Sequence, residues 1–471
     1  MTNIELCDIG MIGLGVMGRN LLLNMADHGF KVAGYDKDKS KVDSLLTDAK
    51  EQGKVFGATT ILDFMKLLKK PHKLIMLVPA GAPVDSAINE FIPYLEKGDL
   101  IIDAGNSHFK DTDIRTQRLS EQGFHFMGVG ISGGEEGARH GPSIMPGGSL
   151  AAYDTVRSIF EAVAAKVNGA PCVAYLGRAS CGHYVKMVHN GIEYGIMQLI
   201  AETYDFMKRA LGFNNQQLHD IYKKWNEEKL NSYLIEITSL IFDKRDEDKN
   251  QFLIDEIVPI AKQNGTGMWT SQSAMELQIP VPTIDLAVAM RDLSVLAKQR
   301  EAASMLYSRP IKIIDSTEHA DFLNHLQDAL FNAMLVVYAQ GMALLASASQ
   351  KYAYQLDLST IANIWRGGCI IRAELLNEIA AAFHLMRELP NCLLNPNLSK
   401  KVMATQESLR KIVAKAAEVG IPTPALMVTL SYLDAYRSAW LPANLIQAQR
   451  DYFGAHTYER IDAKGTFHTK W

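Results

Sequence analysis

The chain has 471 residues, of which 48% are hydrophobic and 21% are charged, and its formal net charge is −4. Its length predicts two or more domains with a sizeable core, and its composition is that of a globular protein. The negative net charge argues against nucleic acid as a partner. No apolar run approaches the ~20 residues of a membrane span, so no membrane partner is expected.

The N-terminal residues lack the basic region of a signal peptide and run straight into a strand pattern. The five cysteines are odd in number and widely spaced, without a C-x-x-C pair. This argues against a disulfide framework or a zinc site. We therefore expect no metal and a reducing, cytoplasmic location. We expect Cys369 to be a small buried residue rather than a nucleophile.

Strand-like and helix-like segments alternate over the first ~170 residues, which predicts a doubly wound parallel sheet. From about residue 180 onward, long helical patterns follow one another and strand signals fade. We predict an α/β Rossmann-type dinucleotide-binding domain over 1–178, a large all-α domain over 179–440 and a short C-terminal tail over 441–471. The candidate strands are 6–13, 30–36, 72–79, 99–105 and 124–130.

A glycine motif follows the first predicted strand and opens a helix. Gly13, Gly15 and Gly18 form G-x-G-x-x-G, which in this context predicts a dinucleotide site. The first glycine permits a tight turn, the second lets the backbone approach a pyrophosphate, and the third lets helix and strand pack closely. A glycine-rich turn without a ligand is the alternative.

The second predicted strand ends in an acid and several lysines. Asp36 stands where a carboxylate would bind the adenosine ribose hydroxyls, which favours NAD and repels a 2′-phosphate. Lys37, Lys39 and Lys41 act in the opposite direction, and a solvated charged turn is the alternative. The predicted cofactor-binding residues are Gly13, Leu14, Gly15, Val16, Met17, Gly18, Asp36, Lys37, Asp38, Val78, Pro79, Ala80 and Asn106.

Glycine-rich segments follow two later strands, at 103–107 (DAGNS) and 128–148. Ligands of doubly wound sheets bind beyond the carboxyl ends of the strands. Asn106, Ser132 and the pair Gly133 and Gly134 are therefore candidates to face the nicotinamide and the substrate.

A polar stripe interrupts the apolar helix predicted over 184–195. Lys186, His189, Asn190 and Glu193 are spaced i, i+3, i+4 and i+7, so they share one face. The stripe is either the solvated side of an amphipathic helix or the wall of a cleft. Apolar residues fill the other directions, which indicates a helix buried nearly all round, where unpaired polar groups are costly.

The helical part contains a faint internal repeat, in which 188–201 aligns without gaps to 330–343. The alignment pairs Asn190 with Asn332 but puts Phe331 opposite the histidine of the stripe. If the repeat is real, the polar stripe belongs to one copy and was added for function. Chance similarity between two buried helices is the alternative.

The whole chain resembles the decarboxylating 6-phosphogluconate dehydrogenase family. The resemblance rests on the motifs GLGVMG, DAGNS, SGGEEGAR, GPSIMPGG, KMVHNGIEYG, SYLIEIT, GTGMWT, WRGGCIIR and QAQRDYFGAHTY. It implies a homodimer that converts 6-phospho-D-gluconate to D-ribulose 5-phosphate and CO₂, normally with NADP and without a metal.

The same resemblance assigns roles to individual residues. It implies that Lys186 is the general base and Glu193 the general acid. A base needs an accessible neutral form, which burial of a lysine favours, and seven helical residues separate the two groups by about 10 Å along the axis. The implied substrate-binding residues are Asn106, Ser132, Gly133, Gly134, His189 and Asn190 for the sugar acid, Tyr194, Thr266 and Arg291 for the phosphate, and Arg450 and His456, reaching from the tail into the neighbouring subunit.

The sequence departs from the family pattern at three places. Asn264, in the predicted substrate site, and Met268 replace lysines. The usual Asn-Arg-Thr of the NADP site is Asp-Lys-Asp from Asp36 onward, and Pro79 replaces another lysine. The cofactor is therefore expected to be NADP or NAD, with NADP the default of the family and Asp36 favouring NAD.

Two other functions remain open. Asn264 makes a related β-hydroxyacid dehydrogenase conceivable, acting on an unphosphorylated sugar acid, but Arg291 and Arg450 suit a phosphate. A catalytically silent NAD(P)-binding protein is the other alternative, and the presence of both Lys186 and Glu193 speaks against it.

Overall fold

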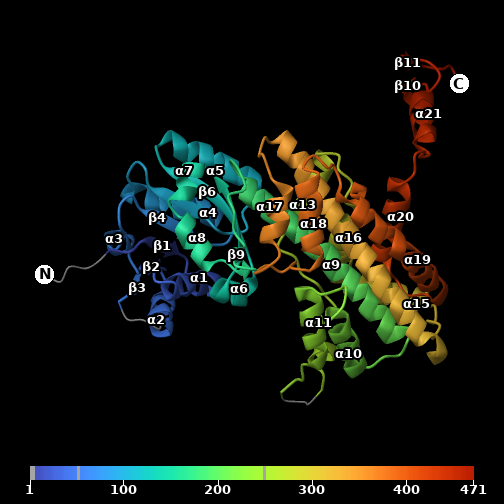
Figure 1. The fold of residues 1–471 in the computed structure, drawn as a ribbon, viewed down its shortest axis with the longest axis horizontal. Coiled ribbons are helices and arrows are strands. Elements are labelled where there is room, and N and C mark those ends of the chain that lie inside the picture. Colours follow the sequence, from blue (N-terminus) through green and yellow to red (C-terminus); the bar gives the residue numbers. More distant parts are fainter. Residues whose placement is uncertain (1–5, 50–52, 248–250) are drawn as a thin grey trace.

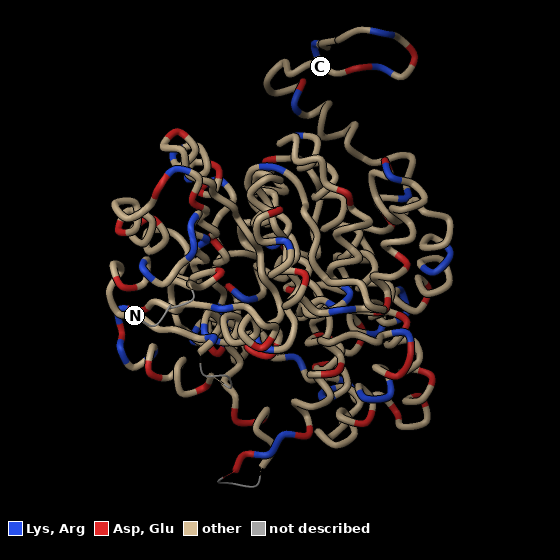
Figure 2. The backbone as a smooth tube through the Cα atoms, turned by 60° about the vertical axis from the view of Figure 1, so that its left-hand side comes forward, with Lys and Arg blue, Asp and Glu red and all other residues tan. Residues whose placement is uncertain are grey.

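The computed structural model describes residues 6–49, 53–247 and 251–471. Figure 1 shows a sheet-containing part at the N-terminal end, a helical part beside it, and a C-terminal arm that stands away from both. Lys and Arg are interspersed with Asp and Glu along the described backbone (Figure 2).

The first part is built on a seven-stranded sheet of order β3-β2-β1-β4-β5-β6-β7. Strands β1 to β6 run parallel, and β7 runs antiparallel to β6. The strands are β1 (Ile9–Ile12), β2 (Val32–Tyr35), β3 (Val55–Ala58), β4 (Lys73–Met76), β5 (Leu100–Asp103), β6 (His125–Ser132) and β7 (Ser143–Gly148).

Helices pack on both faces of this sheet, which confirms the doubly wound fold (Figure 1). They are α1 (Val16–Asp27), α2 (Lys39–Asp48), α3 (Ile61–Lys66), α4 (Ala82–Phe91), α5 (Phe109–Glu121), α6 (Gly134–His140), α7 (Leu150–Asp154) and α8 (Arg157–Val163), with a 3₁₀ turn η1 (Ile92–Tyr94) and a small hairpin of β8 (Lys166–Val167) and β9 (Ala170–Pro171).

The two edge strands were missing from the expected set. β3 is only four residues long, and its two middle residues, Phe56 and Gly57, are only half-buried, unlike those of the equally short β2. β7 contains Pro146 and ends in two glycines, residues that usually argue against a strand. An edge position tolerates proline because one side of the strand needs no ladder hydrogen bond.

The described residues from Cys181 onward are mainly helical and include a short hairpin in the tail. Its helices are α9 (Cys181–Arg209), α10 (Asn215–Asn226), α11 (Tyr233–Asp243), α12 (Leu253–Glu256), α13 (Thr266–Glu276), α14 (Pro282–Val295), α15 (Ala297–Leu306), α16 (His319–Lys351), α17 (Leu358–Ile364), α18 (Leu375–Leu385), α19 (Pro396–Val419), α20 (Pro424–Tyr436) and α21 (Ala443–Gly454), with 3₁₀ turns η2 (Ser316–Glu318) and η3 (Cys392–Leu394).

The two long helices α9 and α16 cross the helical part side by side (Figure 1). They approach closely because glycines face branched side chains: a Cβ at Gly341 would lie 2.5 Å from Ile192, and one at Gly195 would lie 2.8 Å from Val337. By length and composition 316–351 could cross a membrane, but 89% of its most apolar window is buried inside the protein. Its apolar surface is thus used for packing.

The weak repeat has a structural counterpart. Asn190 on α9 donates its side-chain N–H to Thr266 Oγ1 at 3.0 Å. Asn332, the aligned residue on α16, donates in the same way to Thr405 Oγ1 at 2.9 Å. Both asparagines therefore tie their long helix to a threonine of a neighbouring helix, and this favours a duplication over chance similarity.

A buried carboxylate joins α9 to α20. Glu202 is 3% exposed and accepts hydrogen bonds from the first backbone N–H groups of α20, those of Ala425 at 2.7 Å and Leu426 at 3.0 Å. Gln198 donates a third hydrogen bond, at 3.0 Å. A negative group at a helix N-terminus is favourable, but burial raises the pKa of Glu202 to about 7.

The tail consists of α21 and a hairpin of β10 (Tyr458–Glu459) and β11 (Thr466–Phe467). Asp451, with no exposed side-chain surface, holds it together. Its carboxylate accepts from the backbone N–H of Thr457 and Thr469 at 2.9 and 3.0 Å, and from His468 Nδ1 and Trp471 Nε1, each at 2.9 Å. These bonds hold the pKa of Asp451 well below its usual range.

Candidate active site

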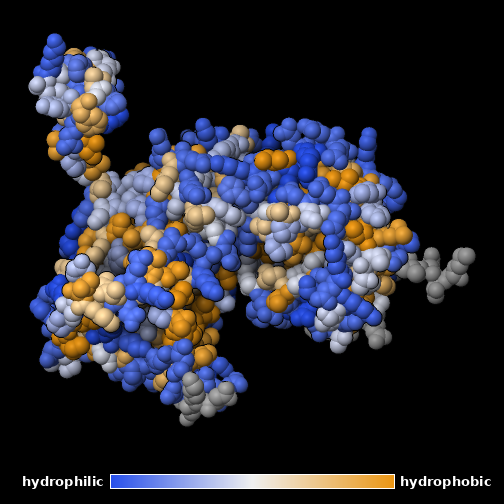
Figure 3. Space-filling model, turned by 180° about the vertical axis from the view of Figure 1, so that it is seen from behind, coloured by the Kyte–Doolittle hydropathy of each residue, from blue (hydrophilic) through white to orange (hydrophobic). Residues whose placement is uncertain are grey.

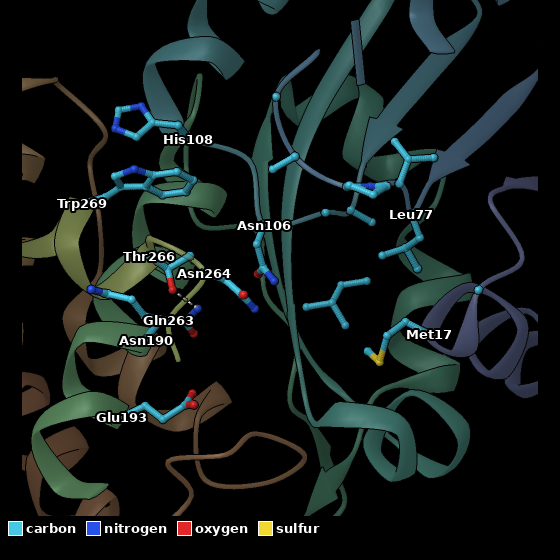
Figure 4. A pocket seen from close by; sticks show the side chains of 18 of the residues that line it. Met17, Leu77, Asn106, His108, Asn190, Glu193, Gln263, Asn264, Thr266 and Trp269 are labelled. Atoms are coloured by element: carbon cyan, nitrogen blue, oxygen red, sulfur yellow. Dashed lines mark hydrogen bonds between the residues drawn. The ribbon is translucent and has the colours of Figure 1, made fainter. Parts of the chain in front are cut away.

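A cavity of about 840 Å³ lies between the carboxyl ends of the strands and helices α9, α13 and α14. Figure 4 shows Met17, Leu77 and Asn106 from the sheet part on one side, and Asn190, Glu193 and Thr266 on the other. The predicted residues that line it are Gly15, Val16, Met17, Gly18, Val78, Pro79, Ala80, Asn106, Asn190, Glu193, Tyr194, Asn264, Thr266 and Arg291.

The glycine turn after β1 forms one end of this cavity. Gly13 has a φ of 94°, so its conformation favours glycine. A Cβ at Gly18 would lie 2.0 Å from the carbonyl oxygen of Gly13, whereas one at Gly15 would meet no protein atom within 4 Å. Packing thus explains Gly18, while the backbone at Gly15 is left open toward the cavity at the N-terminus of α1.

The acid after β2 is engaged by the protein. Asp36 accepts from the backbone N–H of Leu14 at 3.0 Å and from that of Asp38 at 3.0 Å, and Lys41 lies 3.3 Å away. Lys37 pairs with Glu90 at 2.8 Å. The carboxylate therefore holds the glycine turn in place, and Asp36, Lys37 and Asp38, like Gly13 and Leu14, do not line the cavity.

The turn after β5 presents Asn106 to the cavity. Asp103 is fully buried and accepts from the backbone N–H of Gly105 at 3.1 Å and from Ser107 Oγ at 2.6 Å. Arg115, only 2% exposed, donates to the carbonyl of Gly81 at 3.1 Å, which belongs to the preceding loop. The loops after β4 and β5 are thereby fixed to each other behind the cavity.

Helix α9 brings the polar stripe against β6. A Cβ at Gly130 would lie 2.4 Å from the Cβ of Lys186, so the glycine makes room for this lysine. Lys186 is 6% exposed and His189 is fully buried, whereas Asn190 and Glu193 are half-buried at the cavity wall. The burial expected for this helix is confirmed, and the stripe runs from the protein interior into the cavity.

The stripe is connected by a directed chain of hydrogen bonds. The backbone N–H of Ile370 donates to Ser132 Oγ at 3.4 Å, and that hydroxyl donates to His189 Nε2 at 3.1 Å. The opposite ring nitrogen, Nδ1, then donates to Asn190 Oδ1 at 3.1 Å, and Asn190 donates to Thr266. Because Asn190 Oδ1 can only accept, His189 Nδ1 carries a proton, and a neutral ring then accepts from Ser132 at Nε2.

Burial shifts the pKa values of the titratable groups of the stripe. Burial and the charge of Lys186 keep the pKa of His189 well below its ordinary value. Burial lowers the pKa of Lys186, which Glu193 partly opposes, and raises the pKa of Glu193, which Lys186 and Arg291 partly oppose. Lys186 Nζ lies 3.4 Å from His189 Nδ1, and this proximity disfavours a positive charge on both groups at once.

The positive end of the cavity lies at Tyr194 and α13. The Arg291 guanidinium stacks on the Tyr194 ring at 3.3 Å from its centroid. Helix α13 begins at Thr266 without an acidic residue in its first turn, so its N-terminus favours an anion. Gly191 allows this approach, since a Cβ there would lie 2.6 Å from Thr270.

Several predicted site residues lie outside the cavity wall. Lys186, Ser132 and His189 stand behind it in the hydrogen-bonded chain, and Gly133 and Gly134 form the start of α6 beside them. Arg450 and His456 lie on the tail and do not line this cavity. Cys369 is buried, as expected, and burial raises the pKa of its thiol to about 12.

Sequence reasoning missed some lining residues. They are Leu77, Gly81, Ala104, Gly105, His108, Asp111, Ile131, Lys262, Gln263 and Trp269. Trp269 lies inside the quoted GTGMWT motif, and its ring meets that of His108 edge-on at 4.9 Å. Its place inside this motif is a sequence signal for a position at the site.

Comparisons with known proteins agree over the whole chain. The NAD binding domain of 6-phosphogluconate dehydrogenase matches residues 8–177, and the 6-phosphogluconate dehydrogenase C-terminal domain matches 182–471. The chain is 48% identical over 464 residues to the NADP(+)-dependent, decarboxylating 6-phosphogluconate dehydrogenase of Bacillus subtilis, covering 98% of each. It is 48% identical over 470 residues to the decarboxylating 6-phosphogluconate dehydrogenase of Synechococcus elongatus, covering 99% of this chain and 100% of that one.

A solved structure is also similar. The 6-phosphogluconate dehydrogenase of Plasmodium falciparum superposes with a TM-score of 0.95 at 45% sequence identity, covering 99% of this chain and 100% of that one. That protein is described in its apo form, with its cofactor NADP+ and with its substrate 6-phosphogluconate. The similarity includes both the sheet part and the helical part.

Proposed function

The chain belongs to the 6-phosphogluconate dehydrogenase family, and from this membership we propose that it converts 6-phospho-D-gluconate to D-ribulose 5-phosphate and CO₂ while reducing NADP or NAD. One observation carries the proposal. A single cavity joins a dinucleotide-type glycine turn to Glu193, with Lys186 directly behind it on the same helix.

The residues present fit a dinucleotide. The open backbone at Gly15 and the N-terminus of α1, which has no acidic residue in its first turn, suit a pyrophosphate. Val78, Pro79, Ala80 and the turn at Asn106 would hold the nicotinamide end. The relatives from Bacillus subtilis and Plasmodium falciparum support NADP, and Asp36 keeps NAD as an alternative.

The reaction divides between two side chains. When bound, the dinucleotide supplies the acceptor for the hydride at C3. Lys186 takes the proton of the C3 hydroxyl, which its lowered pKa permits. The 3-keto acid then loses its carboxylate as CO₂, and Lys186 returns the proton to the C3 oxygen. Glu193, whose pKa is raised by burial, delivers a proton to the carbon that lost CO₂, while Lys186 takes the proton back from the C3 oxygen so that the enediol becomes the ketone of the product.

We propose that Asn106 and Asn190 contact the sugar acid, that Ser132 and His189 position Asn190 from behind the cavity wall, and that Gly133 and Gly134 shape that end. The phosphate is held by a separate group, Tyr194, Thr266 and Arg291, because the cavity is positive there. The hydrogen-bonded chain through His189 orients Asn190 before substrate arrives, which reduces the entropy lost on binding.

We also propose a homodimer in which the tail of each chain completes the site of its partner through Arg450 and His456. The arm stands away from its own body (Figure 1), and it exposes large apolar side chains. Trp440 is 62% exposed and Phe453 is 72% exposed, and Figure 3 shows apolar surface at the base of the arm. Such surfaces mark protein contacts.

A reducing cytoplasm suits the five cysteines, all free and buried.

The experiment is a coupled assay with 6-phosphogluconate and either dinucleotide, in which reduced nicotinamide and CO₂ are measured together. The proposal expects equal amounts of both. Reduced nicotinamide without CO₂ would indicate a simple β-hydroxyacid dehydrogenase, and no reduction with either dinucleotide would indicate a silent binding protein.

A further inference from the structure

A second cation lines the cavity near Arg291, and the proposed function gives it no role. Lys262 lies four residues before the start of α13 and belongs to the cavity wall. Its side chain is exposed, and within the described parts of the chain no carboxylate lies within ion-pair distance of its ammonium. An unpaired cation at a cavity wall is available to a ligand.

The backbone around this lysine is clamped to α14. The N–H of Ala261 donates to Ser294 Oγ at 2.9 Å, and Gln263 Nε2 donates to Asp292 Oδ1 at 2.6 Å. Between them, Arg291 donates to the carbonyl oxygen of Lys262 at 3.3 Å. The backbone is thus fixed on both sides of Lys262 and bonded to Arg291, while the ammonium of Lys262 makes no ion pair with the described residues.

The charges of the cavity indicate which part of the substrate this lysine meets. The acidic residues of the wall are Asp111 and Glu193, and its cations are Lys262 and Arg291. Burial lowers the pKa of His108, so that ring adds no charge near neutral pH. The two cations and the N-terminus of α13 therefore form the anion-binding end of the cavity.

We propose that Lys262 binds the phosphate group of the substrate and acts with Arg291 as a second positive charge. This rests on the proposed function and deepens it. Asn264, two residues further on, also lines the cavity but is neutral. The positive charge of this segment is therefore supplied by Lys262. The planar guanidinium of Arg291, stacked on Tyr194, would orient the phosphate. The flexible ammonium of Lys262 would add positive charge in any of several orientations.

The test compares Lys262→Gln with the full-length wild type. We expect the KM for 6-phosphogluconate to rise on the order of tenfold, the loss of one charge-assisted hydrogen bond. The affinity for inorganic phosphate, followed by Trp269 fluorescence at the cavity wall, should fall in parallel. The dissociation constant of the dinucleotide should not change. Lys224→Gln, an exposed lysine of α10, is the matched control.

Two further variants separate charge from structure. Lys262→Arg should keep most of the wild-type affinity, and Lys262→Gln combined with Asn264→Lys should recover it, because the charge returns to the same end of the cavity. An unchanged KM and phosphate affinity in Lys262→Gln would overturn the proposal, as would equal losses for phosphate and dinucleotide. Wild-type phosphate binding that depends on Lys262, without turnover of 6-phosphogluconate, would overturn only the proposed function.

Discussion

Replacing Glu202 by Gln should change how stability depends on pH. The pKa of this buried carboxyl is about 7 in the folded chain and 4.5 for an ordinary glutamate. A raised pKa means that the folded state holds the proton more tightly than the unfolded state. Between pH 4.5 and 7 the unfolded chain therefore ionises first, and the free energy of unfolding falls as pH rises.

The magnitude follows from the shift of about 2.5 units between these two values, which corresponds to about 3 kcal/mol at 1.36 kcal/mol per unit. Glutamine has no proton to lose, so this loss disappears in the variant. The unfolding free energy of Glu202→Gln minus that of the wild type should therefore rise by about 2.5 kcal/mol between pH 5 and pH 8.

Urea unfolding measures this difference, with both proteins at one concentration because subunit association contributes to stability. Glu407→Gln is the control, since Glu407 is exposed on α19. Its difference from the wild type should vary much less with pH. Parallel stability profiles of Glu202→Gln and the wild type would refute the reasoning and show that the carboxylate is ionised in the folded protein throughout.

Lys186→Met should abolish nicotinamide reduction while dinucleotide binding persists, and near wild-type turnover would disprove the role of Lys186 as base. Glu193→Gln should slow product protonation more than hydride transfer in single-turnover kinetics. Mixing Arg450→Ala with Lys186→Met chains should restore about a quarter of wild-type activity, because about half of the dimers are hybrids with one intact site; no recovery after subunit exchange would place the tail in its own subunit's site. The two dinucleotides should give comparable kcat/KM, or favour NAD, because Asp36 repels a 2′-phosphate; a strong NADP preference would contradict this, and Lys37→Ala should then raise the KM for NADP selectively.

The central strands and the polar stripe could be predicted because each has a local signal. Continuous apolar runs mark the buried strands β1, β2, β4, β5 and β6, and helical spacing marks the row that starts at Lys186. The edge strands are harder to recognise, because β3 is short and half-buried at its centre, and β7 carries Pro146 and two terminal glycines, which an edge tolerates.

The positions of Lys262, His108 and Trp269 depend on packing between distant segments. Lys262 reaches the cavity because its neighbours bond to α14, about thirty residues later. No periodic pattern in the sequence records that contact. Similarly, the hydrogen bond from the backbone N–H of Leu14 gives Asp36 a second role, in holding the glycine turn, that the motif alone does not show.

The hydrogen bonds that order the tail around Asp451 reduce the conformational entropy that would be lost when two subunits associate. Its hydrogen-bond donors all come from residues 457–471, so the arm is ordered within its own chain. A floppy arm of this length would lose ~1–2 kcal/mol per residue on docking, from backbone freedom alone. In the proposed dimer that entropy is lost when each chain folds, before the subunits meet, and docking orders little more than the connection between α20 and α21. The tail would therefore dock as a preformed unit, instead of folding as it binds the partner subunit.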